Sequence, residues 1–317
     1  MDITPKTLFI QLTNFCNNHC TICIYRNNTR GLTDTKHMSS NIIEKILENI
    51  TKTKSIDNIL FGPLYGEAQL HPYFYTLVER IKMIRSNIKI TLLTNGKLIT
   101  EDNLEKYKGD HVQISVLGNK TRPNTYNAQT GLNWNDLKIK AKLLFAADIS
   151  YGFSLNMTTL DDIEEAILDL HELPGFSAIY RYKIDIIKNQ DTKDFLIRCK
   201  YLNLKYNVRL NDDEHHFDDA ILESGLTNIT FNNIYEYCHQ LYDVMTITVD
   251  GDILVCPCEM SCSYKSGNIM LNTLLEIFNT THMNNVRNLV AQRQFALINP
   301  CATLCGYKHE NSSSSKI

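Results

Sequence analysis

Hydrophobic residues recur along residues 7–206 in two alternating patterns. Short runs of apolar and β-branched residues predict strands at 7–13, 57–62, 88–94, 111–118, 151–158 and 178–187. Between them, apolar positions at helical spacing predict helices at 39–52, 71–85, 133–147, 160–173 and 191–206. Six alternations of strand and helix indicate a parallel sheet with helices packed outside it. We therefore expect an α/β fold, a partial (β/α)6 TIM-like barrel, with ligands bound at the carboxyl ends of its strands.

The regular alternation ends near residue 207. Two strand-forming runs on either side of Asp250 and Gly251 predict a β-hairpin over 244–258, because Asp-Gly is a favoured hairpin turn. Stretches at 271–279 and 283–292 predict short helices. We therefore expect four parts: a core at 1–207, a loop-rich bridge at 208–235, a small domain at 236–310 and a disordered polar tail at 311–317.

Composition and charge exclude several classes of partner. The 317 residues are 43% hydrophobic and 21% charged, as in soluble globular proteins, and the net charge is −3. That charge provides no general attraction to nucleic acid or to an anionic membrane. No apolar run approaches the roughly 20 residues of a membrane span, and the first residues lack the apolar centre of a signal peptide. We therefore expect a cytoplasmic protein that binds neither nucleic acid nor membranes.

Nine of the ten cysteines fall into two groups. In a reducing cytosol, close sets of thiols hold metal or perform redox chemistry more often than they form disulfides. Cys16, Cys20 and Cys23 form the first group, spaced as C-x3-C-x2-C directly after the first predicted strand. Three thiolates this close can bind three irons of a [4Fe–4S] cluster and leave the fourth iron open to another ligand. The alternative is a zinc site completed by His19 or by a distant residue.

The second cysteine group lies in the C-terminal part of the chain. Cys238 and Cys256 span the predicted hairpin as C-x12-G-x4-C, and Cys301 and Cys305 follow as C-x3-C. Because the hairpin strands run antiparallel, thiols far apart in the sequence can meet. Four thiolates can bind every iron of a second [4Fe–4S] cluster, which then suits electron transfer or structural support. A structural zinc ion on the same four thiols is the alternative.

The first cysteine group and two later segments resemble the radical S-adenosylmethionine (SAM) superfamily over most of residues 5–190. Cys16, Cys20 and Cys23 match the cluster motif of that family. The resemblance implies that the open iron binds the amino and carboxylate groups of SAM. It also implies that reductive cleavage of SAM, with an electron from a flavodoxin- or ferredoxin-type donor, gives a 5′-deoxyadenosyl radical that abstracts a substrate hydrogen atom.

The segments that the resemblance assigns to SAM binding follow later strands. Tyr65-Gly66-Glu67-Ala68 is similar to the family's Gly-Gly-Glu-Pro segment, although two of its four residues differ. Leu93-Thr94-Asn95-Gly96 resembles another family signature, and by itself it reads as an Asn-Gly turn. Asn156 is equally well explained as a plain asparagine at the end of a strand. The candidate SAM-binding residues are Tyr65, Gly66, Glu67, Asn95, Ser115, Arg122 and Asn156.

The C-terminal part resembles the SPASM/twitch auxiliary-cluster domains of radical SAM enzymes. The hairpin between Cys238 and Cys256 and the segment 266–279 both match. A full SPASM domain carries more cysteines near its end than Cys301 and Cys305. The shorter twitch type, with one auxiliary [4Fe–4S] cluster, is therefore the better match.

Cys258 and Cys262 are not needed for either cluster and are the candidate catalytic residues. A free thiol gives a hydrogen atom to a substrate radical readily, because an S–H bond is weaker than most C–H bonds. Abstraction on one face of a carbon and return on the other face inverts that centre. An inert structural thiol at either position is the other interpretation.

We therefore predict an epimerase that acts on a natural-product sugar, an aminoglycoside or a ribosomal peptide. No separate leader-binding module is visible before the first predicted strand near residue 7, and this slightly favours a small molecule as the substrate. Dehydrogenation or peptide cross-linking, with the auxiliary cluster as electron acceptor, is the alternative reaction. A non-catalytic zinc or iron–sulfur binding module is the alternative class of protein.

Overall fold

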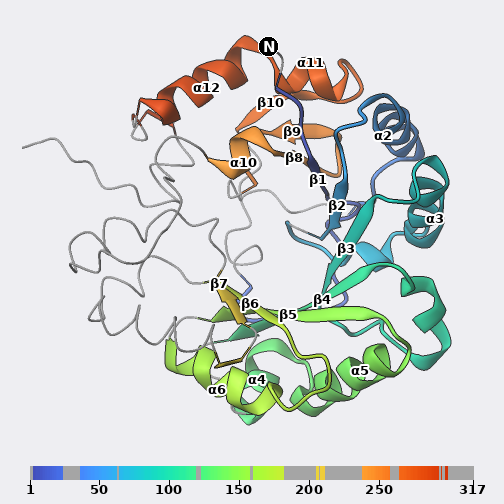
Figure 1. Ribbon diagram of the computed structural model, residues 1–317, viewed down its shortest axis with the longest axis vertical. Coiled ribbons are helices and arrows are strands. Elements are labelled where there is room, and N and C mark those ends of the chain that lie inside the picture. Colours follow the sequence, from blue (N-terminus) through green and yellow to red (C-terminus); the bar gives the residue numbers. More distant parts are fainter. Residues whose placement is uncertain are drawn as a thin grey trace, which may run out of the picture.

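The computed structural model describes residues 3–23, 36–62, 64–118, 123–157, 160–181, 205–206, 208–210, 238–257, 264–292, 294 and 297–298. Its strands form one ten-stranded sheet in the order β10-β9-β8-β1-β2-β3-β4-β5-β6-β7. Neighbouring strands from β8 through β1 to β7 are parallel, whereas the β8–β9 and β9–β10 pairs are antiparallel. The sheet curves into an open arc with helices on its outer side (Figure 1).

The first six strands belong to the expected alternation, and the seventh lies at the start of the segment that was predicted as a loop-rich bridge. They are β1 (Thr7–Ile10), β2 (Asn58–Phe61), β3 (Lys89–Thr94), β4 (His111–Gly118), β5 (Ser150–Met157), β6 (Ala178–Arg181) and β7 (Val208–Leu210). The helices among them are α2 (Ser40–Lys52), α3 (Phe74–Ile84), α4 (Pro123–Thr130), α5 (Trp134–Ala146) and α6 (Leu160–Leu170), with 3-10 turns η1 (Ala68–Leu70) and η2 (Glu101–Tyr107). The predicted α/β fold, with parallel strands inside a layer of helices, is confirmed.

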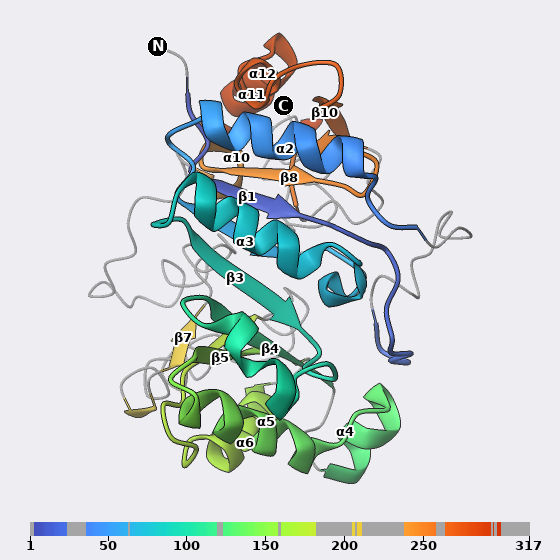
Figure 2. The ribbon, with the colours of Figure 1, turned by 90° about the vertical axis from the view of Figure 1, so that its right-hand side faces the viewer.

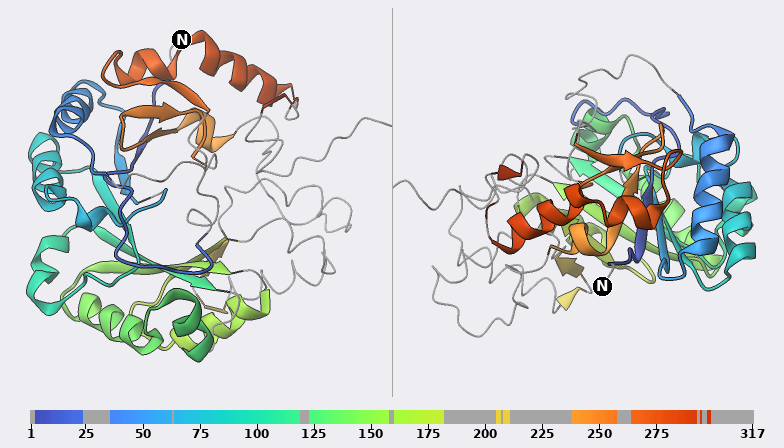
Figure 3. Two further views of the ribbon diagram at one scale, coloured as in Figure 1. Left: turned by 180° about the vertical axis from the view of Figure 1, so that it is seen from behind. Right: turned by 90° about the horizontal axis from the view of Figure 1, so that it is seen from above.

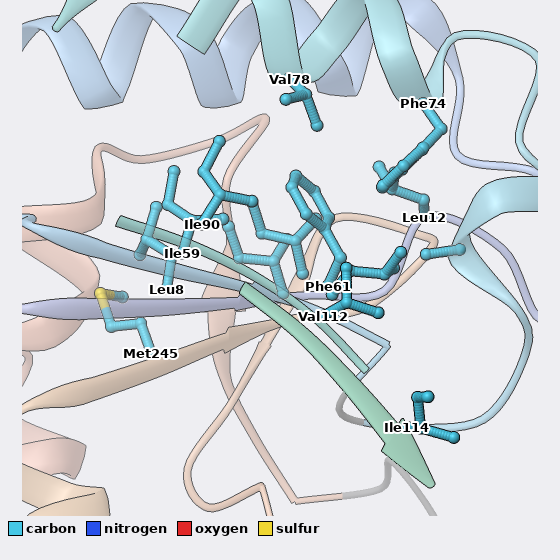
Figure 4. Close-up of a cluster of buried hydrophobic side chains, with 14 of the residues drawn as sticks. Leu8, Leu12, Ile59, Phe61, Phe74, Val78, Ile90, Val112, Ile114 and Met245 are labelled. Atoms are coloured by element: carbon cyan, nitrogen blue, oxygen red, sulfur yellow. The ribbon is translucent and has the colours of Figure 1, made fainter. Parts of the chain in front are cut away.

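Alternation along the strands divides apolar from polar side chains. Ile59 and Phe61 of β2 point outward and are buried beneath Phe74 and Val78 of α3 (Figure 4). Figure 2 shows α2 and α3 lying across this outer face of the sheet. Because successive side chains alternate, the other positions face the inside of the arc. On β4 and β5 these inner positions include several that are polar or glycine, among them Gln113, Ser115, Gly152, Ser154 and Asn156.

Two connections differ from the pattern expected from sequence. The link between β3 and β4 is the 3-10 turn η2 rather than an α-helix. The helix α4 was not predicted, because its sequence PNTYNAQT has no apolar stripe and buries only Tyr126 and Thr130 among its side chains. The predicted helix at 191–206 lies almost entirely outside the described residues.

The C-terminal elements continue the same sheet. They are α10 (His239–Tyr242), β8 (Val244–Ile247), β9 (Asp252–Leu254), β10 (Lys265–Asn268), α11 (Leu274–Phe278) and α12 (Thr281–Ala291). The predicted hairpin is confirmed over β8 and β9, with Gly251 at a φ of +78° in its turn. Strand β8 pairs with β1 from Thr7↔Val244 to Ile10↔Ile247, so the hairpin extends the core sheet. None of the helices in the described part of the chain is long and apolar enough to span a membrane.

Candidate functional site

The three N-terminal cysteines lie on the loop that leaves the carboxyl end of β1. Cys20 is buried and Cys16 and Cys23 are partly buried, and Cys23 N donates to the Cys20 carbonyl over 3.3 Å. Burial, followed by charge repulsion from the neighbouring Cys23 and Cys16, raises the pKa of Cys20 to about 11. Burial likewise raises the pKa of Cys16. Three thiols that repel one another as thiolates need a positive partner, so the loop fits a metal cluster.

The helix α4 holds this loop in place. Asn18 Nδ2 donates to the Thr130 carbonyl over 2.7 Å and lies 3.0 Å from the sulfur of Cys20. Thr21 N donates to the Gln129 carbonyl over 2.8 Å. Seen from behind, the chain after β1 reaches across to α4 (Figure 3). Sequence reasoning missed Asn18 because an asparagine between two cysteines carries no signal of its own.

The turn after β2 packs directly against the start of the cysteine loop. Glu67 N donates to the Phe15 carbonyl over 2.8 Å. Gly66 has a φ of +97°, and a Cβ atom there would lie 2.0 Å from the Thr13 carbonyl oxygen. No residue other than glycine fits this contact, since a side chain has neither the backbone freedom nor the space. Gly66 therefore brings the Tyr65–Glu67 backbone beside the loop that carries Cys16.

Glu67 is a buried carboxylate with spare acceptor capacity. Glu67 is 2% exposed, and burial raises the pKa of its carboxyl group to about 7. Oε2 accepts a hydrogen bond from Asn95 N over 3.0 Å, whereas Oε1 makes no hydrogen bond in the part of the chain that the structure describes. A buried acidic oxygen without a donor fits a cationic group of a ligand, such as an ammonium.

Asn95 joins the cysteine loop to Glu67. Its backbone N–H donates to Glu67, and its Nδ2 donates to Asn17 Oδ1 over 3.0 Å and lies 3.8 Å from the Cys16 sulfur. Gly96 follows with a φ of +77°, so the Asn-Gly turn is also present. Three predicted positions, Cys16, Glu67 and Asn95, therefore meet at the carboxyl edge of β1, β2 and β3.

Ser115 and Asn156 lie together on the inner face of β4 and β5. Asn156 Nδ2 is 3.4 Å from Ser115 Oγ and 3.2 Å from Ser154 Oγ. Among the described residues, no hydrogen bond joins this pair to the cysteine loop or to Glu67. Strand β4 runs from His111 to Gly118, the range predicted from the sequence, so Ser115 lies within the strand.

The C-terminal cysteines are described only in part. Cys238 is partly buried directly before α10, and Cys256 is buried two residues after β9. The other candidates lie outside the described residues, and they are Arg122, Cys258, Cys262, Cys301 and Cys305. Their proposed roles stay predictions from the sequence.

Replacement of Glu67 by glutamine is expected to change how stability depends on pH. The pKa of Glu67 rises from 4.5 to about 7 on folding, so the folded state binds more protons between these values and wild-type stability falls as pH rises through that window. The Glu67→Gln variant has no carboxyl group to ionise at this position. Its free energy of unfolding is therefore expected to rise relative to that of wild type by up to about 3 kcal/mol as the pH increases from 4 to 8. Urea unfolding of both proteins, without added ligand, measures the difference. A difference that is the same at every pH would contradict the burial of an ionisable Glu67.

Comparison with known families and structures identifies the fold. Residues 10–173, just over half of the chain, match the radical SAM superfamily, and residues 238–306 match the SPASM iron–sulfur cluster-binding domain. No curated protein matches the sequence. The chain is similar to Streptococcus suis SuiB bound to the precursor peptide SuiA, with 20% identity and a TM-score of 0.69 over 90% of this chain and 67% of SuiB. The chain thus spans about two thirds of the length of SuiB.

Two further structures share the fold. The protein anSMEcpe with bound AdoMet, another name for SAM, has 18% identity and a TM-score of 0.65 over 98% of this chain and 88% of its own. BtrN in complex with AdoMet and 2-DOIA has 15% identity and a TM-score of 0.51 over 96% and 94%. Radical SAM domains carry a [4Fe–4S] cluster and bind SAM, and SPASM domains carry auxiliary iron–sulfur clusters. The chain belongs to the radical SAM superfamily, with a SPASM domain after its core.

Proposed function

We propose that this protein abstracts a hydrogen atom from a carbon of a peptide, a sugar or an aminoglycoside-like substrate, and that it inverts the configuration of that carbon. The observation that carries the first part is the meeting of the cysteine loop, Gly66, Glu67 and Asn95 at one edge of the parallel strands. When bound there, the reduced cluster and SAM supply a 5′-deoxyadenosyl radical that takes a hydrogen atom from the substrate.

The residues of this chain would position those groups. Cys16, Cys20 and Cys23 would hold the [4Fe–4S] cluster, and the buried Glu67 would accept hydrogen bonds from the amino group of SAM. Asn95 contacts both Glu67 and Cys16 and so fixes the position of Glu67 relative to the cysteine loop. Ser115 and Asn156 would offer a hydroxyl and an amide to SAM from β4 and β5, and Arg122 is the proposed partner of its carboxylate.

The C-terminal domain would hold one auxiliary [4Fe–4S] cluster. Its proposed ligands are Cys238, Cys256, Cys301 and Cys305, which fit a domain of 236–310 after a bridge at 208–235. A flavodoxin- or ferredoxin-type protein is the proposed source of electrons for the first cluster. These assignments apply the sequence pattern to the matched SPASM domain.

The substrate class is supported by what similar structures contain. SuiB is bound to the precursor peptide SuiA, anSMEcpe to the Cp18Cys peptide, and BtrN to 2-DOIA. These support a peptide or a small molecule equally. For the reaction itself, a free Cys258 or Cys262 would give a hydrogen atom to the opposite face of the carbon radical. The resulting thiyl radical would be reduced by one electron from the flavodoxin- or ferredoxin-type donor and one proton from water. Without such a donor, loss of an electron to the auxiliary cluster would give dehydrogenation or a cross-link.

Solvent deuterium uptake distinguishes these outcomes. The iron-loaded, reduced protein is incubated anaerobically in deuterated water with SAM and candidate peptides or aminoglycosides. Epimerisation through a thiol is expected to give 5′-deoxyadenosine and one deuterium in the product, and Cys258→Ala or Cys262→Ala is expected to abolish that incorporation. A product that has lost two hydrogen atoms and contains no deuterium would show dehydrogenation instead. A colourless, zinc-containing protein that forms no 5′-deoxyadenosine would identify a binding module.

A further inference from the structure

A buried glutamine joins the proposed SAM-binding turn to the C-terminal hairpin. Gln11 lies directly after β1, between β2 and β8, and is 1% exposed. Its Nε2 donates to the Tyr65 carbonyl over 3.1 Å, and its Oε1 accepts from Val249 N over 3.1 Å. Tyr65 begins the turn that contains Gly66 and Glu67, and Val249 follows β8. One side chain therefore contacts both parts of the molecule.

The chemistry of its partners fixes the orientation of the Gln11 amide. A carbonyl oxygen only accepts hydrogen bonds and a backbone N–H only donates them, so the amide nitrogen must face Tyr65 and the amide oxygen must face Val249. The contact with Val249 is buried and the contact with Tyr65 is partly buried, which makes the loss of either one costly.

A second link between the same regions is much more exposed. Lys36 Nζ lies 2.6 Å from Asp250 Oδ1 in the hairpin turn, and the backbone N–H of Lys36 donates to Asn14 beside the cysteine loop. Both charged side chains are about half exposed, at 46% and 53%. Exposed ion pairs contribute little to stability or to fixed geometry. Gln11 therefore provides a buried contact between the turn and the hairpin, in addition to the contacts of the turn with Phe15 and Asn95.

We propose that Gln11 is a positioning residue for SAM: it holds the Tyr65–Glu67 turn in place from the side of the C-terminal hairpin and never touches SAM itself. This inference rests on the proposed role of that turn in binding SAM. It implies that the strength of SAM binding depends on a contact made with the segment leading to Cys256. The hairpin thereby takes part in building the first cofactor site.

The test is a change of one side-chain atom. In Gln11→Glu, studied at a pH where the new carboxyl group is ionised, one oxygen still accepts from Val249 N, but the other cannot donate to the Tyr65 carbonyl and repels it. We expect the Kd for SAM to rise about tenfold, measured by equilibrium dialysis on anaerobic, iron-loaded protein, while iron content stays at the wild-type level. Gln11→Met, which is apolar and of similar length, is expected to weaken SAM binding as well and avoids a buried charge.

Asn49 offers a matched control. It is a buried amide, 2% exposed, whose Nδ2 donates to the Lys45 carbonyl over 2.8 Å and whose Oδ1 accepts from Leu274 N over 2.9 Å. It thus also joins the core to the C-terminal elements, through α2 and α11, without contacting the Tyr65–Glu67 turn. Asn49→Asp and Asn49→Leu are expected to lower Tm as the Gln11 variants do and to leave the Kd for SAM unchanged.

Two results would overturn the inference, and they have different meanings. If Gln11 variants lose thermal stability but bind SAM as wild type does, while Gly66→Ala weakens binding, Gln11 has only a structural role. If Gly66→Ala also binds SAM normally, the turn is not the SAM site and the proposed function loses its basis. Equal weakening of SAM binding in the Asn49 variants would likewise show that loss of stability, rather than positioning, is the cause.

Discussion

Replacement of Gly66 by alanine is expected to weaken SAM binding more than 100-fold and to abolish 5′-deoxyadenosine formation. The added Cβ atom would lie 2.0 Å from the Thr13 carbonyl oxygen and 3.1 Å from the Asn14 Cα, which are both backbone atoms. The turn must therefore move away from the cysteine loop, and Glu67 moves with it. The φ of +97° adds strain that alanine does not tolerate. Equilibrium dialysis for SAM and product analysis by chromatography measure the two effects.

Gly109→Ala is the matched control for backbone strain. Gly109 has a comparable φ of +80°, but a Cβ atom there would have no neighbour within 4 Å. This variant is expected to lose about 1 kcal/mol of stability from strain alone and to keep wild-type SAM affinity. If Gly66→Ala and Gly109→Ala bind SAM equally well, the close approach at Gly66 is not needed for cofactor binding.

Replacement of Cys20 by alanine is expected to remove one cluster and all radical chemistry. Cys20 is the most deeply buried thiol of its loop, and its sulfur is contacted by Asn18. Without it, two thiolates remain for three irons, so the first cluster is not retained. Iron content after anaerobic reconstitution is expected to fall from about eight atoms per chain to about four, because the proposed auxiliary cluster would be bound by the C-terminal cysteines instead. Formation of 5′-deoxyadenosine is expected to be undetectable.

The control for Cys20 is Cys199→Ala, since Cys199 belongs to neither cysteine group of the sequence. This variant is expected to keep full iron content and activity. A Cys20→Ala protein that retains wild-type iron and still cleaves SAM would show that the loop does not hold the catalytic cluster. Elemental analysis for iron, sulfide and zinc decides the point independently of any assay with substrate.

The local sequence predicted which segments form helices and strands better than it predicted which strands pair with one another in the sheet. Ser39 marks the start of α2 by accepting a hydrogen bond from Ile42 N, and Asn133 caps α5 in the same way. The Asp250-Gly251 turn gives the hairpin of β8 and β9. In contrast, the parallel pairing of β8 with β1 joins segments more than two hundred residues apart, and no local pattern encodes such a partner.

The residues of the candidate site show the same difference between local sequence signals and contacts that only the fold creates. The three cysteines were predictable because their spacing is a contiguous signal, and Glu67 was predictable from a short segment that resembles the family. Asn18 and Gln11 were not, because each acts through partners brought near only by the fold. Gln11 in particular reads as one more residue of a strand-forming run until its contacts to Tyr65 and Val249 are known.

The position of β1 between β2 and β8 affects how this protein can be divided. A fragment ending before residue 238 would expose the backbone N–H and C=O groups of Thr7–Ile10 that now pair with Val244–Ile247. Unpaired strand edges favour association with other chains, and this edge belongs to the strand that leads into the cysteine loop. The hairpin of β8 and β9 is thus part of the core sheet, and its removal would leave β1 without one of its two neighbouring strands.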